Sequence, residues 1–224
     1  MWSDTSVLDL EPPKSINVAL IVDHSKHNFQ AHKPHPWHGI EPQTDHAGTV
    51  RAFIEVTQYD RIKFEVDPAS GYLCVDRPQR NSSLPPVPYG FIPKTLCGTE
   101  TGTLVRDGVE GDGDALDICV LCEHEITRSE IVLEARIVGG FLTFDSGKAD
   151  PKLIAVLDGD LLWGNIEDLA DVPERLIDRL EHYFRQYKVE RGRENPVKIE
   201  GRCDREKALE LLDAALRDYS EQFE

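Results

Sequence analysis

Residues 110–121 read EGDGDALDICVL, an acidic turn that leads directly into an apolar segment typical of a buried strand. Three aspartates, Asp112, Asp114 and Asp117, lie within six positions of one another. Two carboxylates about 4 Å apart repel each other by roughly 4 kcal/mol at an effective dielectric constant near 20. The trio therefore needs solvent, protons or cations, and short carboxylates on a turn suit hard divalent cations such as Mg²⁺.

Two other interpretations compete for this stretch. A solvated Asp/Gly turn that only ends a loop explains the trio equally well when the trio is considered alone. An EF-hand loop beginning at Asp112 would place Leu116 at its fifth position and Asp117 at its sixth, where glycine is required. The strand-like ICVLC would also have to serve as loop, so the spacing disfavours a calcium-binding structural module.

The surrounding sequence indicates short strands joined by turns. In RIKFEV, the apolar residues Ile62, Phe64 and Val66 alternate with Lys63 and Glu65, which places the two sets on opposite faces of a strand. The DPASG that follows is typical of a hairpin turn. Such strands predict a small barrel rather than a sheet of βαβ units. The expected strands are 50–58, 61–66, 72–77, 115–126, 130–144 and 152–160.

Two helices are expected near the C-terminus. The first covers 171–192, with Asp171 as N-cap, Pro173 in the first turn and an apolar stripe at helical spacing. The second covers 204–223, with Asp204 as N-cap. The fold class is therefore α+β and mainly β: a barrel with flanking C-terminal helices.

The length of 224 residues suits one domain with appendages. Residues 1–48 are rich in proline and histidine and are interpreted as a partly irregular N-terminal arm, with the folded domain in 49–224. Prolines prevent a helix that could align the imidazoles, so we expect a packed or mobile arm rather than a metal-binding tract. The histidines of the arm are His24, His27, His32, His35, His38 and His46.

The composition limits the partners and the compartment. A net charge of −16 excludes nonspecific coating of nucleic acid or of an anionic membrane. The sequence contains no apolar run of about 18 residues and no signal-peptide pattern. Cys119 and Cys122, inside an apolar run, are interpreted as core residues. The odd number of five cysteines in a chain of this length indicates reduced thiols and therefore the cytoplasm.

Further charged groups accompany the aspartate trio. Each group alone is more typical of a solvated surface, but together they supply acid clusters for metals and donors for phosphate oxygens. That combination is what phosphoryl transfer requires. The additional candidates are Glu55, Lys63, Glu65, Arg77, Asp145, Asp150, Lys152, Tyr187 and Lys188.

The sequence resembles the soluble family I inorganic pyrophosphatases. Their Asp-x-Asp-x-x-Asp signature is present as DGDALD, with Ala115 where proline or a small residue is usual. The resemblance runs in order over about residues 35–200 through HPWHGI, FIEV, IKFEVD, GYLCVDR, PYGFIPKTLC, DPKLIAV, HYFRQYKVE and VKIEG. It implies a five-stranded OB-like barrel with flanking helices, and assembly as a homodimer or homohexamer.

The resemblance also implies an activity and residue roles. The activity is hydrolysis of pyrophosphate, bound as its magnesium complex, to two orthophosphates, with several Mg²⁺ ions and a metal-activated water as nucleophile. Asp112, Asp117 and Asp150 would hold two metals, with Asp117 bridging, and Asp114 would accept the proton of the water. Tyr89 would lie in the pocket near Asp114. Further metals would be bound by Asp145, Glu65 and Glu55. The residues that would bind phosphate oxygens are Lys63, Arg77, Lys152, Tyr187 and Lys188.

Two departures from the family pattern support an alternative: a divergent, weakly active relative that acts as a phosphate-binding or interaction module. Ser146 replaces an acidic or amide residue, and Pro85–Pro88 replaces a segment that normally carries tyrosine and asparagine. The segment 97–111 is longer than usual, and we expect it to form a hairpin or flap near the site.

Overall fold

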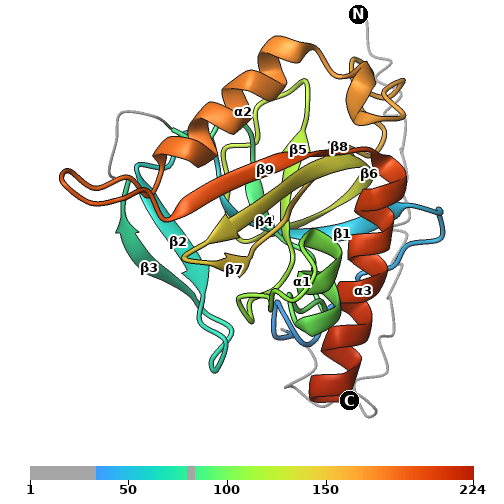
Figure 1. The fold of residues 1–224 in the computed structure, drawn as a ribbon. Coiled ribbons are helices and arrows are strands. Elements are labelled where there is room, and N and C mark those ends of the chain that lie inside the picture. Colours follow the sequence, from blue (N-terminus) through green and yellow to red (C-terminus); the bar gives the residue numbers. More distant parts are fainter. Residues whose placement is uncertain (1–33, 80–83) are drawn as a thin grey trace, which may run out of the picture. The chain divides into compact units, whose positions relative to one another are not determined.

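The computed structural model describes residues 34–79 and 84–224, so His24, His27 and His32 lie outside the described residues. In chain order the elements are β1 (Thr49–Val56), β2 (Ile62–Val66), β3 (Leu73–Pro78), β4 (Tyr89–Phe91), α1 (Thr99–Val105), β5 (Asp117–Leu121), β6 (Ile131–Asp145), β7 (Lys148–Ala149), β8 (Lys152–Leu157), the 3-10 helix η3 (Leu169–Asp171), α2 (Glu174–Gln186), β9 (Val197–Cys203) and α3 (Arg205–Phe223) (Figure 1).

Strands β1, β4, β5, β8 and β6 close into a ring. The ring is complete because β1 pairs with both β4 and β6, while β5 bridges β4 and β8, and β8 pairs with β6. The β5–β8 pair is parallel and the other pairs of the ring are antiparallel. This closed ring, with β2 and β3 as a separate hairpin and three α-helices around it, confirms the mainly-β, OB-like fold.

The long strand β6 serves several partners because it bends at Gly139. Its first half pairs with β1, its middle with β8 and its last part with β9. The pairing with β8 shifts register between Ile137 and Gly139. A Cβ added to Gly139 would lie 2.6 Å from the Leu169 Cβ and 2.7 Å from the Cys203 carbonyl oxygen, so glycine allows both neighbours to pack closely.

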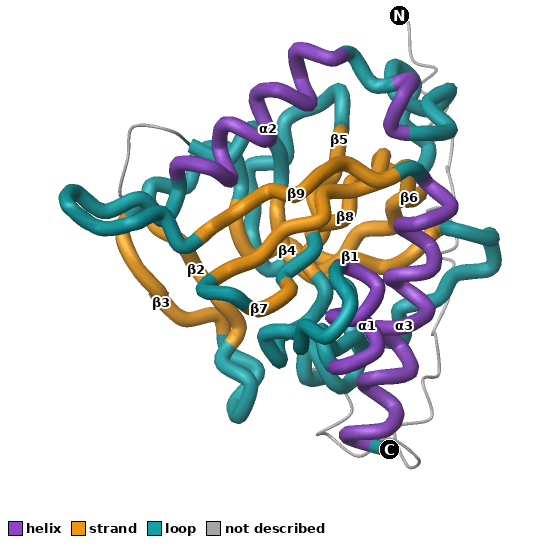
Figure 2. Tube along the Cα trace, in the orientation of Figure 1, coloured by secondary structure: helices purple, strands orange, loops and turns teal. Residues whose placement is uncertain are grey.

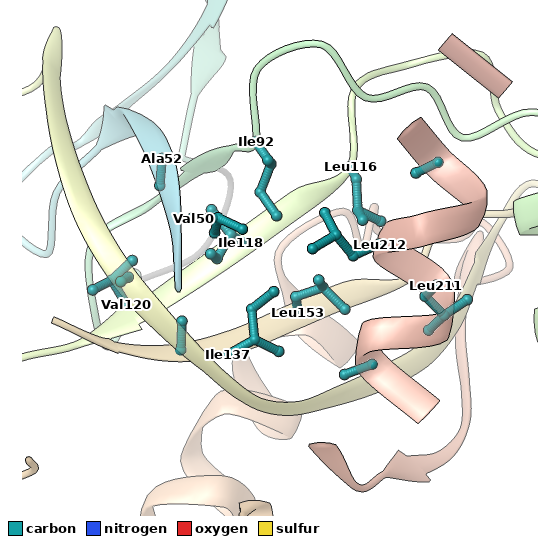
Figure 3. Close-up of a cluster of buried hydrophobic side chains, with 14 of the residues drawn as sticks. Val50, Ala52, Ile92, Leu116, Ile118, Val120, Ile137, Leu153, Leu211 and Leu212 are labelled. Carbon is teal, nitrogen blue, oxygen red and sulfur yellow. The ribbon is translucent and has the colours of Figure 1, made fainter. Parts of the chain in front are cut away.

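The core fills the interior of the ring and is closed by α3. Figure 3 shows Ile118, Ile137 and Leu153 from the strands next to Leu211 and Leu212 of the helix. Each of these strand residues is fully buried. A second apolar cluster lies between the sheet and α2 and includes Phe141 and Phe184. Burying a side chain of this size stabilises the fold by about 1.5–3 kcal/mol.

The helices differ in detail from the sequence-based expectations. Asp171 does not cap α2: it belongs to η3, where it forms a capping box with Asp168, and α2 begins after Pro173. A proline suits that boundary because its fixed φ favours the first turn of a helix. The prediction for α3 is confirmed, since the Asp204 carboxylate accepts a hydrogen bond from the Lys207 backbone N–H. No helix within the described residues is long and apolar enough to cross a membrane.

The segment 97–111, expected as a hairpin or flap near the site, contains the short helix α1 and no strand pair. Figures 1 and 2 both show α1 beside α3 at one end of the barrel. Its sequence has no long apolar stripe, so its conformation depends on contacts with α3. The strand expected over 115–126 is also shorter and begins at Asp117.

Candidate active site

The sheet topology brings the acidic groups together. Asp112 and Asp114 lie on the loop before β5, and Asp117 is the first residue of that strand. Asp150 lies two residues before Lys152, the first residue of β8. Because β5 and β8 are parallel neighbours with Asp117 opposite Lys152, the beginnings of both strands meet at one edge. Carboxylates that are distant in sequence thus share one end of the barrel.

A pocket of about 140 Å³ opens at this edge. It collects residues from the loop before β5, from the β2–β3 hairpin, from β1 and β4, and from the end of α2. The predicted site residues that line it are Glu55, Lys63, Glu65, Tyr89, Asp112, Asp114, Asp117, Asp150, Tyr187 and Lys188. The three other predicted residues, Arg77, Asp145 and Lys152, contact this lining directly, as described below.

Lys152 neutralises part of the buried negative charge. Its ammonium group is fully buried, contacts Asp117, and lies 2.9 Å and 3.0 Å from the two oxygens of Asp150. Burial alone would lower the pKa of Lys152, but the two carboxylates hold it well above its usual value. For Asp117, burial acts to raise the pKa, and the charge and hydrogen bond of Lys152 lower it overall.

Several other carboxyl groups of the pocket have raised pKa values. Burial raises the pKa of Asp112 to about 6, and the neighbouring Asp114 adds to the shift. Burial raises the pKa of Asp150 to about 8 despite the opposing effect of Lys152, and that of Glu55 to about 7. Raised values in a group of acids mark a place where additional positive charge would be stabilised.

The donor set fits a hard divalent cation. Asp112, Asp117 and Asp150 present carboxylate oxygens to one pocket, and oxygen is the donor that Mg²⁺ prefers. Among the described residues, no three acidic, histidine or cysteine side chains already converge at ligand distances. In this structure the Lys152 ammonium group contacts Asp117 and Asp150 at the same time.

The β2–β3 hairpin contributes cations to the pocket. Lys63 of β2 is buried, with 8% of its surface exposed, whereas the apolar Ile62 beside it is 37% exposed. The face of β2 that carries Lys63 therefore turns a charged side chain inward at this position. Lys63 pairs with Glu65 and, at 3.4 Å, with Asp76, which also pairs with Arg77. Sequence reasoning did not single out Asp76, although it lies inside the quoted GYLCVDR segment.

Glu55 is tied to the same hairpin from β1. The backbone N–H of Val66 donates to the Glu55 carboxylate at 2.7 Å. This bond fixes a buried carboxylate at the junction of β1 and β2, on the lining of the pocket.

The C-terminal end of α2 closes the opposite side. Lys188 pairs with Asp145 at the end of β6, and the Arg77 guanidinium lies 5.8 Å from the centre of the Tyr187 ring. The Lys188 hydrogen bond and charge lower the pKa of Asp145, although burial acts to raise it. Ser146, beside Asp145, donates its hydroxyl to the Asp145 carboxylate at 3.0 Å, so it completes a turn and adds no charge.

Two aromatic residues line the pocket. The Tyr89 hydroxyl donates a hydrogen bond to the Asp117 carboxylate. Tyr89 is on β4, directly opposite Cys119 of β5, so its ring extends toward the start of β5. Trp37, which was assigned to the arm, is buried on the lining, and its indole N–H donates to the Thr95 carbonyl at 2.7 Å.

The proline run packs against the barrel directly before Tyr89. Pro85, Val87 and Pro88 are buried, and the Pro88 carbonyl accepts a hydrogen bond from the Val120 backbone N–H at 3.0 Å. The substitution of tyrosine and asparagine by proline in this segment therefore leaves an ordered support for Tyr89.

Comparison with known proteins gives one consistent result. The family model for inorganic pyrophosphatase matches residues 52–220. The inorganic pyrophosphatase of Chlamydia muridarum is 43% identical over 199 residues, which cover 84% of this chain and 95% of that protein. The soluble inorganic pyrophosphatase of Oryza sativa subsp. indica is 29% identical over 186 residues, which cover 83% of this chain and 79% of that protein.

Solved structures agree with the sequence comparison. The inorganic pyrophosphatase of Thermus thermophilus superposes with a TM-score of 0.72 at 31% identity, covering 84% of this chain and 99% of that one. The inorganic phosphatase of Anaplasma phagocytophilum gives a TM-score of 0.70 at 29% identity, covering 81% and 99%. Matching residues, fold and pocket chemistry lead to one assignment: the chain belongs to the family I inorganic pyrophosphatases.

Proposed function

We propose that this chain hydrolyses inorganic pyrophosphate to two orthophosphates in the pocket at the start of β5 and β8. The observation that carries the proposal is the convergence of four aspartates with buried lysines in one pocket of a family I pyrophosphatase fold. Carboxylates suit the metals that accompany pyrophosphate, and lysines suit its phosphate oxygens. An acidic protein can therefore bind an acidic substrate as its metal complex.

Magnesium is the proposed metal, in several ions per site. Asp112, Asp117 and Asp150 would hold the ions next to the nucleophile, and Asp145, Glu65 and Glu55 would serve others. Bound Mg²⁺ would lower the pKa of its water toward neutrality and offset the charge of the phosphates. In this proposal Lys152 orients Asp117 and Asp150 through the contacts described above and turns toward substrate oxygens when the ions bind.

Asp114 is the proposed proton acceptor for the attacking water. Its side chain lines the pocket, and its backbone is fixed because its carbonyl accepts a hydrogen bond from the Cys97 N–H at 2.7 Å. Burial raises the pKa of Asp114, and the charge of Asp117 adds to the shift. A raised pKa makes the carboxylate a better base near neutral pH.

The cationic and hydroxyl groups are proposed to bind the phosphates. Lys63, Lys152 and Lys188 approach the pocket from β2, β8 and the end of α2. Arg77 and Tyr187 lie together on the hairpin side and can donate to the same phosphate. Donors placed on several sides of the pocket would stabilise the leaving phosphate as its charge develops.

A phosphate-release assay tests the proposal. Purified protein should release two orthophosphates per pyrophosphate with Mg²⁺, and Asp114→Asn and Asp117→Asn should each lower kcat by about 10²–10⁴-fold, because a base or a ligand is lost. Asp213→Asn, on the exposed side of α3, is the matched control and should keep full activity. Robust activity in both site variants would overturn the assignment, and normal turnover of the wild type would exclude the weakly active binding module.

The cellular setting is proposed from the same resemblance and composition. We expect the protein to act in the cytoplasm, in keeping with free thiols at all five cysteines. We expect its partner to be pyrophosphate, and not nucleic acid or a membrane. We also expect a homodimer or homohexamer. Size-exclusion chromatography with light scattering distinguishes these from each other and from a monomer.

A further inference from the structure

A buried aspartate of the C-terminal helix is bound to the beginning of α1. Asp218 is 6% exposed, although it lies on an otherwise amphipathic helix. Its carboxylate accepts hydrogen bonds from the backbone N–H groups of Gly98 (3.1 Å), Glu100 (3.0 Å) and Thr101 (2.9 Å). It also accepts one from the Thr101 hydroxyl at 2.7 Å. Residues 98–101 are thereby held by a side chain distant in sequence.

The segment held by Asp218 is bonded in turn to the acidic loop. The Gly98 carbonyl accepts from the Gly111 N–H at 3.0 Å, directly before Asp112. Cys97 makes two further bonds: its N–H donates to the Asp114 carbonyl at 2.7 Å, and its carbonyl accepts from the Gly113 N–H at 3.0 Å. Two hydrogen bonds therefore connect the Asp218 carboxylate to the residue before Asp112: Gly98 N–H to Asp218, and Gly111 N–H to the Gly98 carbonyl.

The backbone segments along this path are in close contact at three glycines. A Cβ added to Gly111 would lie 2.0 Å from the Cys97 carbonyl oxygen, and one added to Gly102 would lie 2.3 Å from the Val109 carbonyl oxygen. A Cβ added to Gly98 would lie 2.7 Å from the Asp218 Cγ. Backbones in such close contact transmit displacements, so a shift of Gly98 moves Gly111 and the loop that follows it.

We propose that Asp218 is a positioning residue for the metal site, acting through Cys97 and Gly98 on the loop that carries Asp112 and Asp114. The inference rests on the proposed function, because it concerns the same magnesium ligands. Loss of the carboxylate removes the acceptor of the backbone N–H groups of Gly98, Glu100 and Thr101, so the segment must move to satisfy them. Metal ligands tolerate little displacement, and loss of an outer partner typically lowers metal affinity about 10–100-fold.

The test measures magnesium binding without substrate. Isothermal titration calorimetry of Mg²⁺ at 25 °C should give an affinity about 10-fold weaker for Asp218→Ala than for the wild type. Asp218→Asn should lie between the two, because one amide oxygen can still accept from Gly98 and Thr101 while its NH₂ group faces the Glu100 N–H. Phosphate release should show the same order in the Mg²⁺ concentration for half-maximal rate.

Asp204→Ala is the matched control. Asp204 caps the other end of the same helix by accepting from the Lys207 N–H at 2.9 Å, and no hydrogen bond joins it to the acidic loop. This variant should lower the Tm and leave the Mg²⁺ affinity unchanged. A purely structural role for Asp218 predicts the same pattern for Asp218→Ala: a lower Tm with wild-type affinity for Mg²⁺.

Each outcome decides between the two roles. Mg²⁺ affinity within twofold of the wild type in folded Asp218→Ala overturns the proposal. If Asp218→Ala does not fold, an affinity of Asp218→Asn within twofold of the wild type overturns it instead. Wild-type protein that fails to bind Mg²⁺ overturns it as well. Wild-type protein that binds Mg²⁺ but releases no phosphate contradicts the proposed hydrolysis alone, since the effect of Asp218 on Mg²⁺ affinity remains measurable.

Discussion

At the scale of single residues, the site is a balance of buried charges. Asp117 and Asp150 are tolerated because Lys152 lies between them, and Asp112 and Glu55 have raised pKa values because nothing of equal strength offsets their burial. The candidate side chains were found from sequence because their charge density is local: three aspartates lie within six positions. Asp76 was missed because its partner Lys63 contacts it only across the β2–β3 hairpin.

Lys152→Met tests the charge balance. Removing one partner of a buried ion group leaves uncompensated carboxylates, so the free energy of unfolding without Mg²⁺ should fall by about 3–5 kcal/mol. Urea denaturation measures this loss, and saturating Mg²⁺ should restore part of it by replacing the missing positive charge. Lys198→Gln, at an exposed position on β9, is the control and should change little. Equal stability of Lys152→Met and the wild type would contradict this account of the pocket.

At the scale of elements, the site depends on two features of the sheet: the parallel contact of β5 with β8 and the bend of β6. The strands themselves follow from alternation and turns, and the predicted α3 cap follows from a local Asp. The meeting of β5 and β8 could not be read from sequence, since it depends on the order of strands in the ring. Helix α1 was missed for a related reason: Asp218, which caps it, lies over 110 positions away, as the bond to Thr101 spans 117 residues.

Gly139→Ala tests the bend of β6. The added methyl group would overlap Leu169 and the Cys203 carbonyl, and such overpacking typically costs about 1–3 kcal/mol of unfolding free energy. Gly201→Ala is a matched control in β9, because a Cβ there has no atom within 4 Å. Chemical denaturation should show a clear loss for Gly139→Ala and none for Gly201→Ala. If Gly139→Ala lost no more unfolding free energy than Gly201→Ala, β6 would not need glycine at position 139.

At the scale of the whole molecule, the net charge of −16 suits a protein that recognises metal complexes of an anion. The barrel class was predictable because short strands with glycine turns leave few architectures for 224 residues. The position of Trp37 was not, because its burial depends on contacts with Thr95 and the wall of the pocket, far along the chain. The family fold and the pocket chemistry nevertheless agree on one reaction.

Magnesium should stabilise the folded chain as a whole. Ligands that bind only the folded state add about 2.7 kcal/mol at a concentration of 100 Kd, and each 1 kcal/mol raises the Tm of a domain this size by roughly 2–4 °C. Thermal unfolding with Mg²⁺, compared with NaCl at the same ionic strength, measures the effect. A Tm equal in both salts would contradict a magnesium site in this pocket.

The most direct measurement is steady-state release of orthophosphate from pyrophosphate across a range of Mg²⁺ concentrations, for the wild type and Asp117→Asn. We expect no release without Mg²⁺, saturable release of two orthophosphates per pyrophosphate with it, and a loss of about 10²-fold or more in the variant. Release by the wild type that does not depend on Mg²⁺, or full activity of Asp117→Asn, would contradict the account.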